Sequence, residues 1–402
     1  MRNPDACTAE PAELVTPPDP FAPEAIKRLA ARYGSPLLII DAERIRAGYR
    51  RLAAALPGVD LHYALKPLPH GAVIEILRDE GAFFDLATNG EVELVRRAGI
   101  APARCIQTHP IKRDSDIRTA LAFGVDTFVA DNPDEIRKFV KHRRRASLLI
   151  RVAFRSPEAV CDLSRKFGCE PDAVLPLIEL AASLGIRVRG LSFHVGSQAG
   201  GPAMHVEAIA ACAQLLRRAA ADGHALGVLD IGGGFPVEYR QAVPSIEEFC
   251  APLRAALRGV PEGIRVIAEP GRFIAAPAAV AVASVMGRAK RAGKWWYYLD
   301  DGLYGSYNGR MFDHANYRID SLRSGDERHP SVLAGPTCDS IDVIDEDIQL
   351  PLLHAGDLIV GRTMGAYTWA SATEFNLFPK AAVLVVDRGR VICGGDHDDR
   401  PT

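Results

Sequence analysis

The sequence predicts an α/β fold in which a (β/α)8 barrel is joined to a second, all-β domain that is mainly C-terminal. Two observations predict it. Between about residues 61 and 270, eight short segments rich in β-branched and apolar residues alternate with stretches of helical spacing. After about residue 276, strand-like segments follow one another with only Gly, Asp and Pro turns between them. An open, doubly wound parallel sheet is the alternative for the first region.

The candidate barrel strands alternate with linkers of helical periodicity. In GAVIEILRDEG, for example, Val73, Ile76 and Leu77 share one face, and Gly81 stands where a helix C-terminal cap belongs. Residues of chemical interest fall at the strand ends, which form the active face of a barrel, so we favour the barrel over the open sheet. The candidate strands are LHYALK (61–66), AFFDLA (82–87), CIQTH (105–109), DTFVA (126–130), SLLIRVAF (147–154), VRGLSFHV (188–195), VLDIGG (228–233) and RVIAEP (265–270).

The chain divides by pattern into four parts. We expect a flexible, proline-rich leader at residues 1–20, a lead-in segment at 21–45, the barrel at 46–275 and the β domain at 276–402. The segment LLIIDAERI (37–45) either joins the β domain or bridges the two domains. The β-domain strands are expected in AAVAVASVMGRAK, KWWYYLD, SVLAGPT, DLIVGRT and AAVLVVDRGRVICGG.

Composition excludes several classes of protein. The 402 residues are 48% hydrophobic and 24% charged, and the net charge of -2 gives no basic surface for nucleic acid or an anionic membrane. No apolar run reaches membrane-spanning length, and the first residues lack the apolar core of a signal peptide. The eight cysteines show no CxxC and no zinc-ligand spacing, so we expect reduced thiols, no metal site and a cytoplasmic protein.

The stretch LHYALKPLPH (61–70) ends an apolar strand pattern with a single lysine, Lys66. Because Pro67 does not continue a sheet ladder easily, Lys66 is expected at the mouth of its strand. An apolar setting would lower the pKa of Lys66 towards the free amine that imine chemistry needs. The alternative is a surface lysine whose alkyl stem packs on apolar neighbours.

Three later segments, also at strand ends, carry groups suited to a phosphate. LDIGGGFP places consecutive glycines, 232–234, directly after a strand, where backbone N–H groups can approach an anion closely. Ser197 in FHVGSQ could donate its hydroxyl, and Arg272, which follows Gly271 in EPGRF, could meet phosphate oxygens. A tight turn between a strand and a helix would explain the glycines equally well.

Two more residues suit a cofactor with an aromatic ring. Glu269 could pair with a protonated pyridine nitrogen and keep the ring a strong electron sink, although an ordinary ion pair with Arg272 is the alternative. His194 could stack on the ring, although a lone histidine in a strand is more often a core residue. Together with Lys66, these groups predict a pyridoxal phosphate site at the mouth of the barrel.

Taken together, the motifs of the chain resemble the fold type III, alanine-racemase-like pyridoxal phosphate decarboxylases. That group includes ornithine, lysine, diaminopimelate and biosynthetic arginine decarboxylases, and the likeness spans roughly residues 35 to 395. The motifs occur in the order of the family. They are YALK around Lys66, FDLAT around Asp85, LSRKFG (163–168), FHVGSQ (193–198), DIGGGFP (230–236), AEPGRF (268–273), GPTCDSID (335–342) and MGAYT (364–368).

The resemblance implies a role for each matching residue at the cofactor. Lys66 would hold the cofactor covalently, His194 would stack on its ring, and Glu269 would pair with the ring nitrogen. The other implied cofactor contacts are Asp85 and Arg151 on the lysine side, Ser197, Gly234, Gly271, Arg272 and Tyr367 around the phosphate, and Gly233 and Pro270 next to them.

The resemblance also implies a homodimer, because in this family the partner subunit completes each active site. The GPTCD segment of one subunit would reach the barrel of the other. Cys338 would then be the proton donor to the carbanion left by the loss of carbon dioxide, and Asp339 would bind the distal group of the substrate. A buried structural thiol is the alternative for Cys338.

Substrate choice depends on a few positions. Diaminopimelate decarboxylases have glutamate after the cysteine and an arginine in an earlier loop, whereas this chain reads Cys338-Asp339. The loop DDGLYGSYNGRMFDHANY resembles that of eukaryotic-type ornithine decarboxylases, with Phe312 and Asp313 as substrate contacts. Two carboxylates, Asp313 and Asp339, suit a distal ammonium. The substrate is therefore expected to be L-ornithine or L-lysine, and the product a diamine of polyamine biosynthesis.

Several departures from the family pattern cluster near the substrate. Pro-Leu-Pro follows Lys66, Phe312 replaces a tyrosine, CDSID replaces CDGLD, and Arg310 is an unusual neighbour for a cation site. The alternatives are therefore meso-diaminopimelate or a modified amino acid of siderophore or secondary metabolism. A non-catalytic relative that binds regulators is an alternative of another class, and such a protein is expected to lose Lys66 or Cys338.

Overall fold

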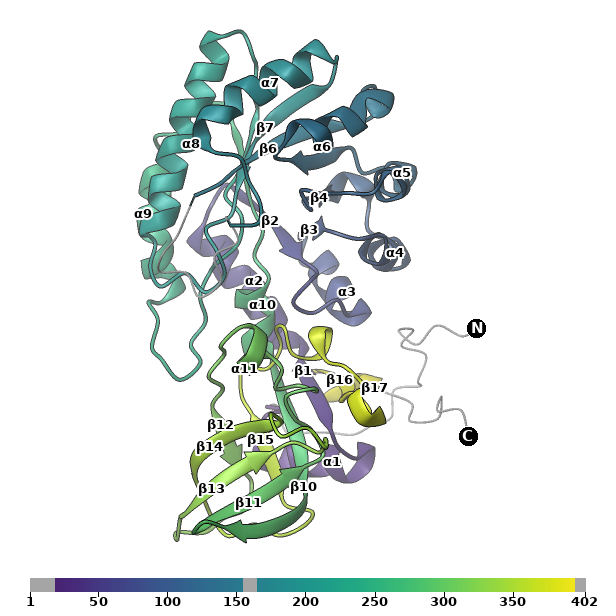
Figure 1. Cartoon of the computed structure of the whole chain (residues 1–402), viewed down its shortest axis with the longest axis vertical. Helices are drawn as coiled ribbons and strands as arrows, with labels where there is room; N and C mark the ends of the chain where they lie inside the picture. Colours follow the sequence, from purple (N-terminus) through teal and green to yellow (C-terminus); the bar gives the residue numbers. More distant parts are fainter. Residues whose placement is uncertain (1–18, 155–164, 395–402) are drawn as a thin grey trace. The chain divides into compact units, whose positions relative to one another are not determined.

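The computed structural model describes residues 19–154 and 165–394 of the chain (Figure 1). They form two compact units. Among these residues, one unit consists of those within Tyr49–Val237 and Val243–Phe273, and the other consists of the remaining described residues. The predicted leader, residues 1–20, lies almost entirely outside the described residues. The predicted limits of the barrel domain, residues 46–275, stay a prediction.

The first unit is a closed barrel whose eight parallel strands pair in sequence order, with the last strand pairing back to the first. All eight predicted strands are present, which confirms the barrel and rules out the open sheet. Helices surround the strands (Figure 1). The strands are β2 (Val59–Ala64), β3 (Phe83–Leu86), β4 (Cys105–Gln107), β5 (Thr127–Ala130), β6 (Ser147–Val152), β7 (Arg187–Phe193), β8 (Val228–Asp230) and β9 (Arg265–Ala268).

Three helices between the strands, α4, α6 and α9, start at a residue whose side chain accepts a hydrogen bond from a backbone N–H of the first turn. Thr88 and Glu91 form a reciprocal capping box at the start of α4, and Ser245 and Glu248 form another at the start of α9. Such caps stabilise a helix by about 1 kcal/mol each. The helices between the strands are α3 (Gly71–Asp79), α4 (Asn89–Arg97), α5 (Asp114–Phe123), α6 (Pro133–Lys138), α7 (Val174–Ser183), α8 (Ala203–Ala221) and α9 (Ile246–Leu257), while α2 (Ala42–Ala55) precedes β2 and α10 (Arg272–Ala275) follows β9.

An apolar layer fills the interior of the barrel. Ile106, Val129, Leu149 and Ile267 come from four different strands and pack together, with Val228 against them. Branched side chains that point inward from alternating strands are the usual filling of a (β/α)8 barrel. The interior is therefore a packed core rather than a channel, and chemistry is confined to the ends of the strands.

The second unit is built on a nine-stranded mixed sheet. Strand β1 lies inside it, antiparallel to β10 and parallel to β16, so the segment LLIID belongs to this sheet. Strands β12 and β14 were not among the predicted strands. The strands are β1 (Leu37–Asp41), β10 (Ala279–Arg291), β11 (Lys294–Leu299), β12 (Ile319–Ser321), β13 (His329–Ala334), β14 (Val343–Leu350), β15 (Leu358–Gly361), β16 (Ala382–Asp387) and β17 (Arg390–Gly394).

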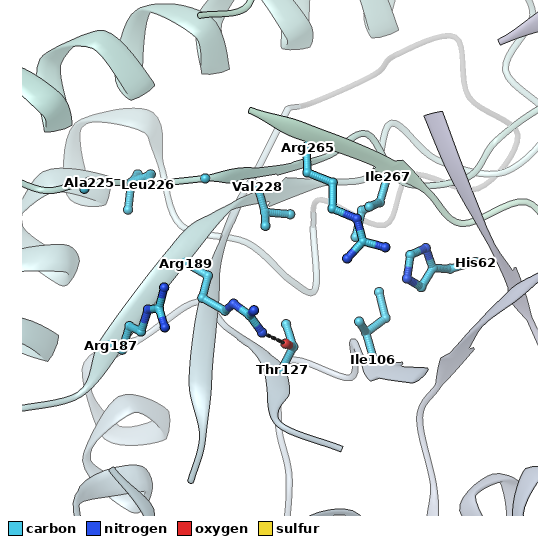
Figure 2. Close-up of a pocket in the computed structure, with 11 residues that line it drawn as sticks. His62, Ile106, Thr127, Arg187, Arg189, Ala225, Leu226, Val228, Arg265 and Ile267 are labelled. Atoms are coloured by element: carbon cyan, nitrogen blue, oxygen red, sulfur yellow. Dashed lines mark hydrogen bonds between the residues drawn. The ribbon is translucent and has the colours of Figure 1, made fainter. Parts of the chain in front are cut away.

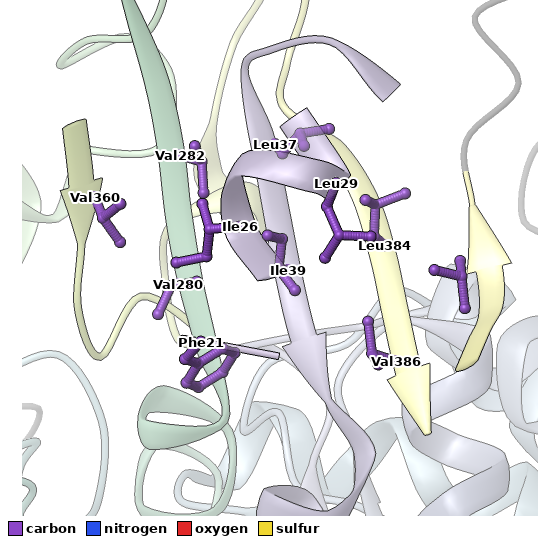
Figure 3. Close-up of a cluster of buried hydrophobic side chains, with 11 residues drawn as sticks. Phe21, Ile26, Leu29, Leu37, Ile39, Val280, Val282, Val360, Leu384 and Val386 are labelled. Carbon is purple, nitrogen blue, oxygen red and sulfur yellow. The ribbon is translucent and has the colours of Figure 1, made fainter. Parts of the chain in front are cut away.

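The α-helices α1 (Pro23–Tyr33) and α11 (Gly309–Phe312) lie entirely within this unit, so it is not purely β. Ile26 and Leu29 of α1 are fully buried against the central strands of the sheet. Figure 3 shows the cluster, whose other members are Phe21, Leu37, Ile39, Val280, Val282, Val360, Leu384, Val386 and Val391. The N-terminal lead-in segment is thus an integral part of the core of the β-sheet unit.

One part of the cysteine prediction is wrong. Cys393 in β17 takes part in a disulfide, whereas Cys105, Cys169, Cys212, Cys250 and Cys338 are free. The sequence could exclude metal-type spacing but carries no information on which distant cysteines meet in space. In the part of the chain that the structure describes, none of the helices combines the length and apolarity needed to cross a membrane.

Candidate active site

The predicted lysine lies at the carboxyl end of the barrel. Strand β2 ends at Ala64, and Lys66 stands in the turn that follows, with its side chain exposed. Its neighbours are charged: the positive charge of Lys66 opposes the rise in pKa that burial causes at Asp85 and Glu269. The prediction of an apolar setting for Lys66 is therefore wrong, because the strand stops before it and carboxyl groups lie nearby.

Asp85 is a buried carboxyl group on the next strand, β3, and is 4% exposed. The hydroxyl of Thr108 donates a hydrogen bond to Asp85 Oδ1 over 2.5 Å. The pKa of Asp85 is raised to about 7, first by burial and then by the charge of Glu269, while Lys66 and Thr108 oppose the rise. Buried acids with strongly shifted pKa values cluster at functional sites, so Asp85 is a candidate site residue.

Glu269 and Asp230 form a second buried carboxyl group pair, at the ends of β9 and β8. Burial, followed by the charge of Asp230, raises the pKa of Glu269 well above its usual range. Burial also raises the pKa of Asp230 to about 6, while Arg151, 9% exposed on β6, opposes both rises. Two adjacent buried carboxyl groups do not ionise together easily. A cationic donor at this point would favour their ionised forms.

The three glycines after β8 make a close-fitting loop. A Cβ on Gly233 would lie 2.7 Å from the backbone oxygen of Glu269 and 3.1 Å from His194 Nε2. Gly234 has a φ of +98°, and a Cβ there would lie 2.5 Å from the backbone oxygen of Gly196. Only glycine fits these two positions, which leaves the loop's backbone bare as the phosphate prediction requires.

His194 is buried beside this loop, with 8% of its surface exposed. The N–H of Gly196 donates to His194 Nδ1 over 3.0 Å. Burial lowers the pKa of His194 well below its usual range, and the charges of Lys66 and Arg151 lower it further. The imidazole is therefore neutral, and a neutral ring can stack on another ring without the cost of desolvating a charge.

Ser197 and Arg272, predicted from separate motifs, are brought into direct contact. Arg272 is 5% exposed and donates from Nη2 to Ser197 Oγ over 2.9 Å. Next to them, a Cβ on Gly271 would lie 2.6 Å from Pro67 Cγ, so the turn after Lys66 packs on Gly271. The Ala64 N–H also donates to the backbone oxygen of Pro270 over 3.0 Å. These contacts hold the end of β2 against the segment after β9.

These residues fit pyridoxal phosphate. A dianionic phosphate suits the bare glycine loop with the Ser197 hydroxyl and the Arg272 guanidinium. A basic ring nitrogen suits the buried Glu269 carboxyl group, and an aldehyde suits the amine of Lys66. The barrel thus brings together the predicted cofactor residues, which are Lys66, Asp85, Arg151, His194, Ser197, Gly233, Gly234, Glu269, Pro270, Gly271 and Arg272.

The remaining predicted residues belong to the β-sheet unit. Tyr367 is half-buried and has a φ of +55°, which is uncommon for a residue with a side chain. Phe312, the last residue of α11, is 66% exposed, and the half-buried Asp313 follows it as the helix cap. Cys338 is exposed and Asp339 is half-buried.

The segment that carries Cys338 is held by one buried carboxylate, Asp342. Its Oδ2 accepts from the N–H and the hydroxyl of Thr337 over 3.1 and 2.7 Å, and its Oδ1 accepts from the Leu303 N–H over 2.7 Å. The hydroxyl of Tyr304 donates to Asp339 Oδ2 over 2.5 Å and lowers the pKa of Asp339. Cys338 is thus presented on a loop with fixed geometry, and the next residue is an ionised carboxylate.

Sequence reasoning missed five residues that support the site. Thr108, Asp230 and His205 act in the barrel, where His205 Nε2 lies 3.0 Å from the backbone oxygen of Gly233. Tyr304 and Asp342 act in the β-sheet unit. Asp230 and Asp342 stand inside recognised motifs, DIGGG and CDSID, and could have been found there. Thr108, His205 and Tyr304 act on residues distant in sequence, and no local signal marks them.

Comparisons with known proteins agree with pyridoxal phosphate as the cofactor. Residues 42–276 match the family described as pyridoxal-dependent decarboxylase, pyridoxal binding domain. The chain is 34% identical to the lysine/ornithine decarboxylase of Selenomonas ruminantium over 369 residues, which are 90% of this chain and 92% of that one. It is also 35% identical to antizyme inhibitor 2 of Xenopus laevis over 351 residues, 83% of this chain and 77% of that one.

The fold of the chain is also similar to that of solved decarboxylase structures. The crystal structure of lysine/ornithine decarboxylase complexed with cadaverine from Vibrio vulnificus is 52% identical, with a TM-score of 0.88, and the match covers 91% of this chain and 96% of that one. The family model spans more than half of the chain, and its pyridoxal-binding part coincides with the barrel that carries the lysine, the glycine loop and the buried acids. This chain belongs to the family of pyridoxal-dependent amino-acid decarboxylases, enzymes whose cofactor is pyridoxal phosphate.

Proposed function

We propose that this enzyme decarboxylates a basic L-amino acid, L-ornithine or L-lysine, to a diamine and carbon dioxide. The observation that carries the proposal is the ionised Asp339, whose pKa the Tyr304 hydroxyl lowers, next to the exposed Cys338. A fixed carboxylate suits a distal ammonium and repels a distal carboxylate. The relatives named above support the same substrate class, since similar crystal structures are described with cadaverine and with putrescine.

In the barrel, Lys66 would hold the cofactor, and Glu269 would accept a hydrogen bond from its ring nitrogen. The bound cofactor supplies an electron-withdrawing ring for the electron pair that the departing carbon dioxide leaves behind. His194 would keep a neutral ring against the cofactor face and exclude water there. Asp85, hydrogen-bonded to Thr108, would keep the amine end of Lys66 in place through their opposite charges.

Cys338 would return a proton from Sγ to the α-carbon of the product, and Asp339, with Asp313, would hold the distal ammonium. We propose that these groups serve the barrel of a second subunit in a homodimer. The side chains of Phe312, Ile341, Phe375 and Leu377 support the proposal, because they are 66%, 53%, 42% and 90% exposed in the same unit as Cys338. Exposed apolar side chains that form a contiguous patch mark a surface that another protein covers.

A complementation experiment tests the shared site. Lys66→Ala and Cys338→Ala homodimers are each expected to be inactive, since each lacks one essential group. After subunit exchange, half of the dimers are mixed and have one intact site of two, so activity returns to roughly a quarter of wild type. Proven exchange without recovery of activity would show that each site is built within one subunit.

A substrate panel tests the proposed reaction. Ornithine, lysine, arginine, meso-diaminopimelate and glutamate are compared by carbon dioxide release at equal enzyme. We expect ornithine or lysine to have the highest kcat/KM. Asp339→Ala should raise KM for that substrate by roughly tenfold or more, because a charge-assisted contact is lost, and leave cofactor affinity unchanged. The exposed Asp326→Ala variant is the control for the loss of a carboxylate.

One observation favours a different distal group. Arg310 lies in the same short helix as Phe312, and its Nη1 is buried with no hydrogen-bond partner among the described residues. An unsatisfied guanidinium nitrogen there suits a carboxylate, as in meso-diaminopimelate or a citryl-linked amino acid of siderophore metabolism. If such a substrate is the fastest in the panel and Arg310→Ala removes the preference, the distal-ammonium proposal is wrong.

The likeness to antizyme inhibitor 2 keeps a regulatory binding protein as the alternative of another class. The presence of both Lys66 and Cys338 supports the enzyme. If the protein is an enzyme, the purified protein with added cofactor should release carbon dioxide from an amino acid of the panel. A protein that carries the cofactor on Lys66 but turns over no amino acid of the panel would favour the regulatory alternative.

A further inference from the structure

A second pocket lies at the amino-terminal end of the barrel, where the strands begin. Its volume is about 390 Å³, and residues from β2, β4, β5, β7, β8 and β9 line it together with the loop 225–227. Figure 2 shows the side chains of Arg189 and Arg265 extending into this space from β7 and β9. The cofactor residues described above follow the carboxyl ends of the same strands, so this pocket is separate from them along the strand direction.

Three guanidinium groups line the pocket. Arg189 Nη1 donates to Thr127 Oγ1 over 2.7 Å and pairs with Asp126 over 3.1 Å (Figure 2). Arg265 Nε pairs with Asp60 over 2.6 Å. The third, Arg187, is exposed, and its side chain makes no hydrogen bond or ion pair within the described part of the chain. Three cations facing two carboxylates leave one positive charge in excess.

The other side chains that line the pocket are apolar or neutral. Ile106 and Ile267 are 7% and 2% exposed and belong to the apolar layer inside the barrel, so they close the pocket on that side. His62 is buried and stacks on Phe83 with ring centroids 4.9 Å apart. Burial lowers the pKa of His62 to about 4, so its ring is neutral. The pocket therefore joins an apolar floor to a cationic rim.

We propose that this pocket is a second ligand site, which binds a small organic oxyanion through Arg187, Arg189 and Arg265. Guanidinium groups bind phosphate and carboxylate oxygens in pairs, and Arg187 has its donors available for such a ligand. The volume and the apolar floor suit a ligand with a compact carbon body rather than a bare inorganic ion. A phosphate monoester and a tricarboxylate share this chemistry.

The test uses the holoenzyme, saturated with cofactor so that added phosphates do not occupy the phosphate loop. Isothermal titration calorimetry in a low-salt buffer without phosphate measures binding of inorganic phosphate, glycerol phosphate and citrate, with sodium chloride at equal ionic strength as the blank. We expect saturable binding, one ligand per subunit, of glycerol phosphate or citrate, and weaker binding of inorganic phosphate. Binding of glycerol phosphate would identify the ligand as a phosphate monoester, and binding of citrate would identify it as a tricarboxylate.

Variants locate the ligand. Arg187→Ala should weaken binding at least about fivefold, because a charge-assisted contact is lost, and Arg187→Lys should restore part of it. Arg189→Gln should also weaken binding. Arg218→Ala removes the same charge from the exposed face of α8 and should leave binding unchanged. The proposal is overturned if no probe binds saturably to the wild type, if Arg187→Ala binds as well as wild type, or if Arg218→Ala weakens binding equally.

Discussion

The hydroxyl of Tyr304 donates to Asp339 Oδ2 over 2.5 Å, and the ring of Tyr304 stacks on Phe375 with centroids 4.5 Å apart. Asn376, the next residue, accepts from the Cys338 N–H through its side-chain oxygen over 3.0 Å. The segment with Cys338 and Asp339 is thus held by contacts from both Tyr304 and Asn376. Side chains held in this way keep a substrate-binding group in one geometry.

We predict that Tyr304→Phe raises KM for the diamino acid by roughly threefold to tenfold and changes kcat little, because the hydroxyl that orients Asp339 is lost. The same change raises the pKa of Asp339, so the acid limb of the kcat/KM profile should move to higher pH. Steady-state kinetics from pH 3 to 9 measure both, because a carboxylate whose pKa is lowered from 3.8 titrates at the acid end of that range. Tyr298→Phe removes a hydroxyl elsewhere in the sheet and should leave the profile in place. An unshifted acid limb in Tyr304→Phe would show that Tyr304 does not act on substrate binding.

Lys66→Ala should abolish covalent attachment of the cofactor and lower turnover by about a thousandfold or more, since no other amine replaces the nucleophile. Borohydride reduction followed by peptide mapping should label Lys66 in the wild type and no residue in the variant. Lys27→Ala, which removes an exposed lysine of α1, should be labelled normally. Label on another lysine of the wild type would place the cofactor elsewhere.

The burial of Asp85 predicts a pH dependence of stability. Its pKa is about 7 in the folded state and 3.8 when unperturbed, so between these values the folded protein holds a proton that the unfolded chain has released. The free energy of unfolding should therefore fall as pH rises from about 4 to 7, by an amount of the order of 1 to 4 kcal/mol. Asp85→Asn should flatten this slope in the cofactor-free protein.

Urea denaturation at pH 5 and pH 8 measures the slope, and the exposed Asp326→Asn serves as the control for the loss of a carboxylate. The control should lose as much stability as the wild type between the two pH values. A wild-type slope that persists in Asp85→Asn would assign the titration to the neighbouring pair of Asp230 and Glu269.

Gly234→Ala should weaken cofactor binding by roughly tenfold or more, because a φ of +98° and a contact of 2.5 Å leave no room for a methyl group. Gly200→Ala is the matched control, since a Cβ at Gly200 meets nothing within 4 Å. Fluorescence titration of the cofactor-free proteins measures both affinities. Equal cofactor affinities in the two variants would show that the glycine loop does not bind the phosphate.

The sequence predicted the barrel well and its surroundings less well. The barrel strands are runs of buried apolar residues, and buried parallel strands give that signal directly. Strand β14, VIDEDIQL, was missed because three acidic residues are unfavourable in strands in general, and here the sheet accommodates them at exposed or hydrogen-bonded positions. The sequence left open whether Lys66 lies in an apolar setting or at the surface, because its exposure depends on where the strand stops.

Candidate site residues were predicted best where one motif contains the whole interaction. The glycine loop is an example, since the proposed role of Gly233 and Gly234 needs only their own backbone. The hydrogen bond from Thr108 to Asp85 and the bond from Tyr304 to Asp339 join residues 23 and 35 positions apart. The sequence around either residue of such a pair does not predict the contact, which depends on the fold.

The place of β1 in its sheet has a consequence for biosynthesis. Ile39 pairs with Val280 on one side and with Leu384 on the other. Strand β1 is therefore synthesised early, whereas the two strands that pair with it are synthesised much later. The barrel, in contrast, is encoded almost without interruption between these strands and closes from neighbours in sequence. During synthesis the barrel can therefore mature first. Until the last strands leave the ribosome, the apolar face of α1 and the edges of β1 have no native cover, and this interval is when the nascent chain is most exposed to aggregation and to chaperones.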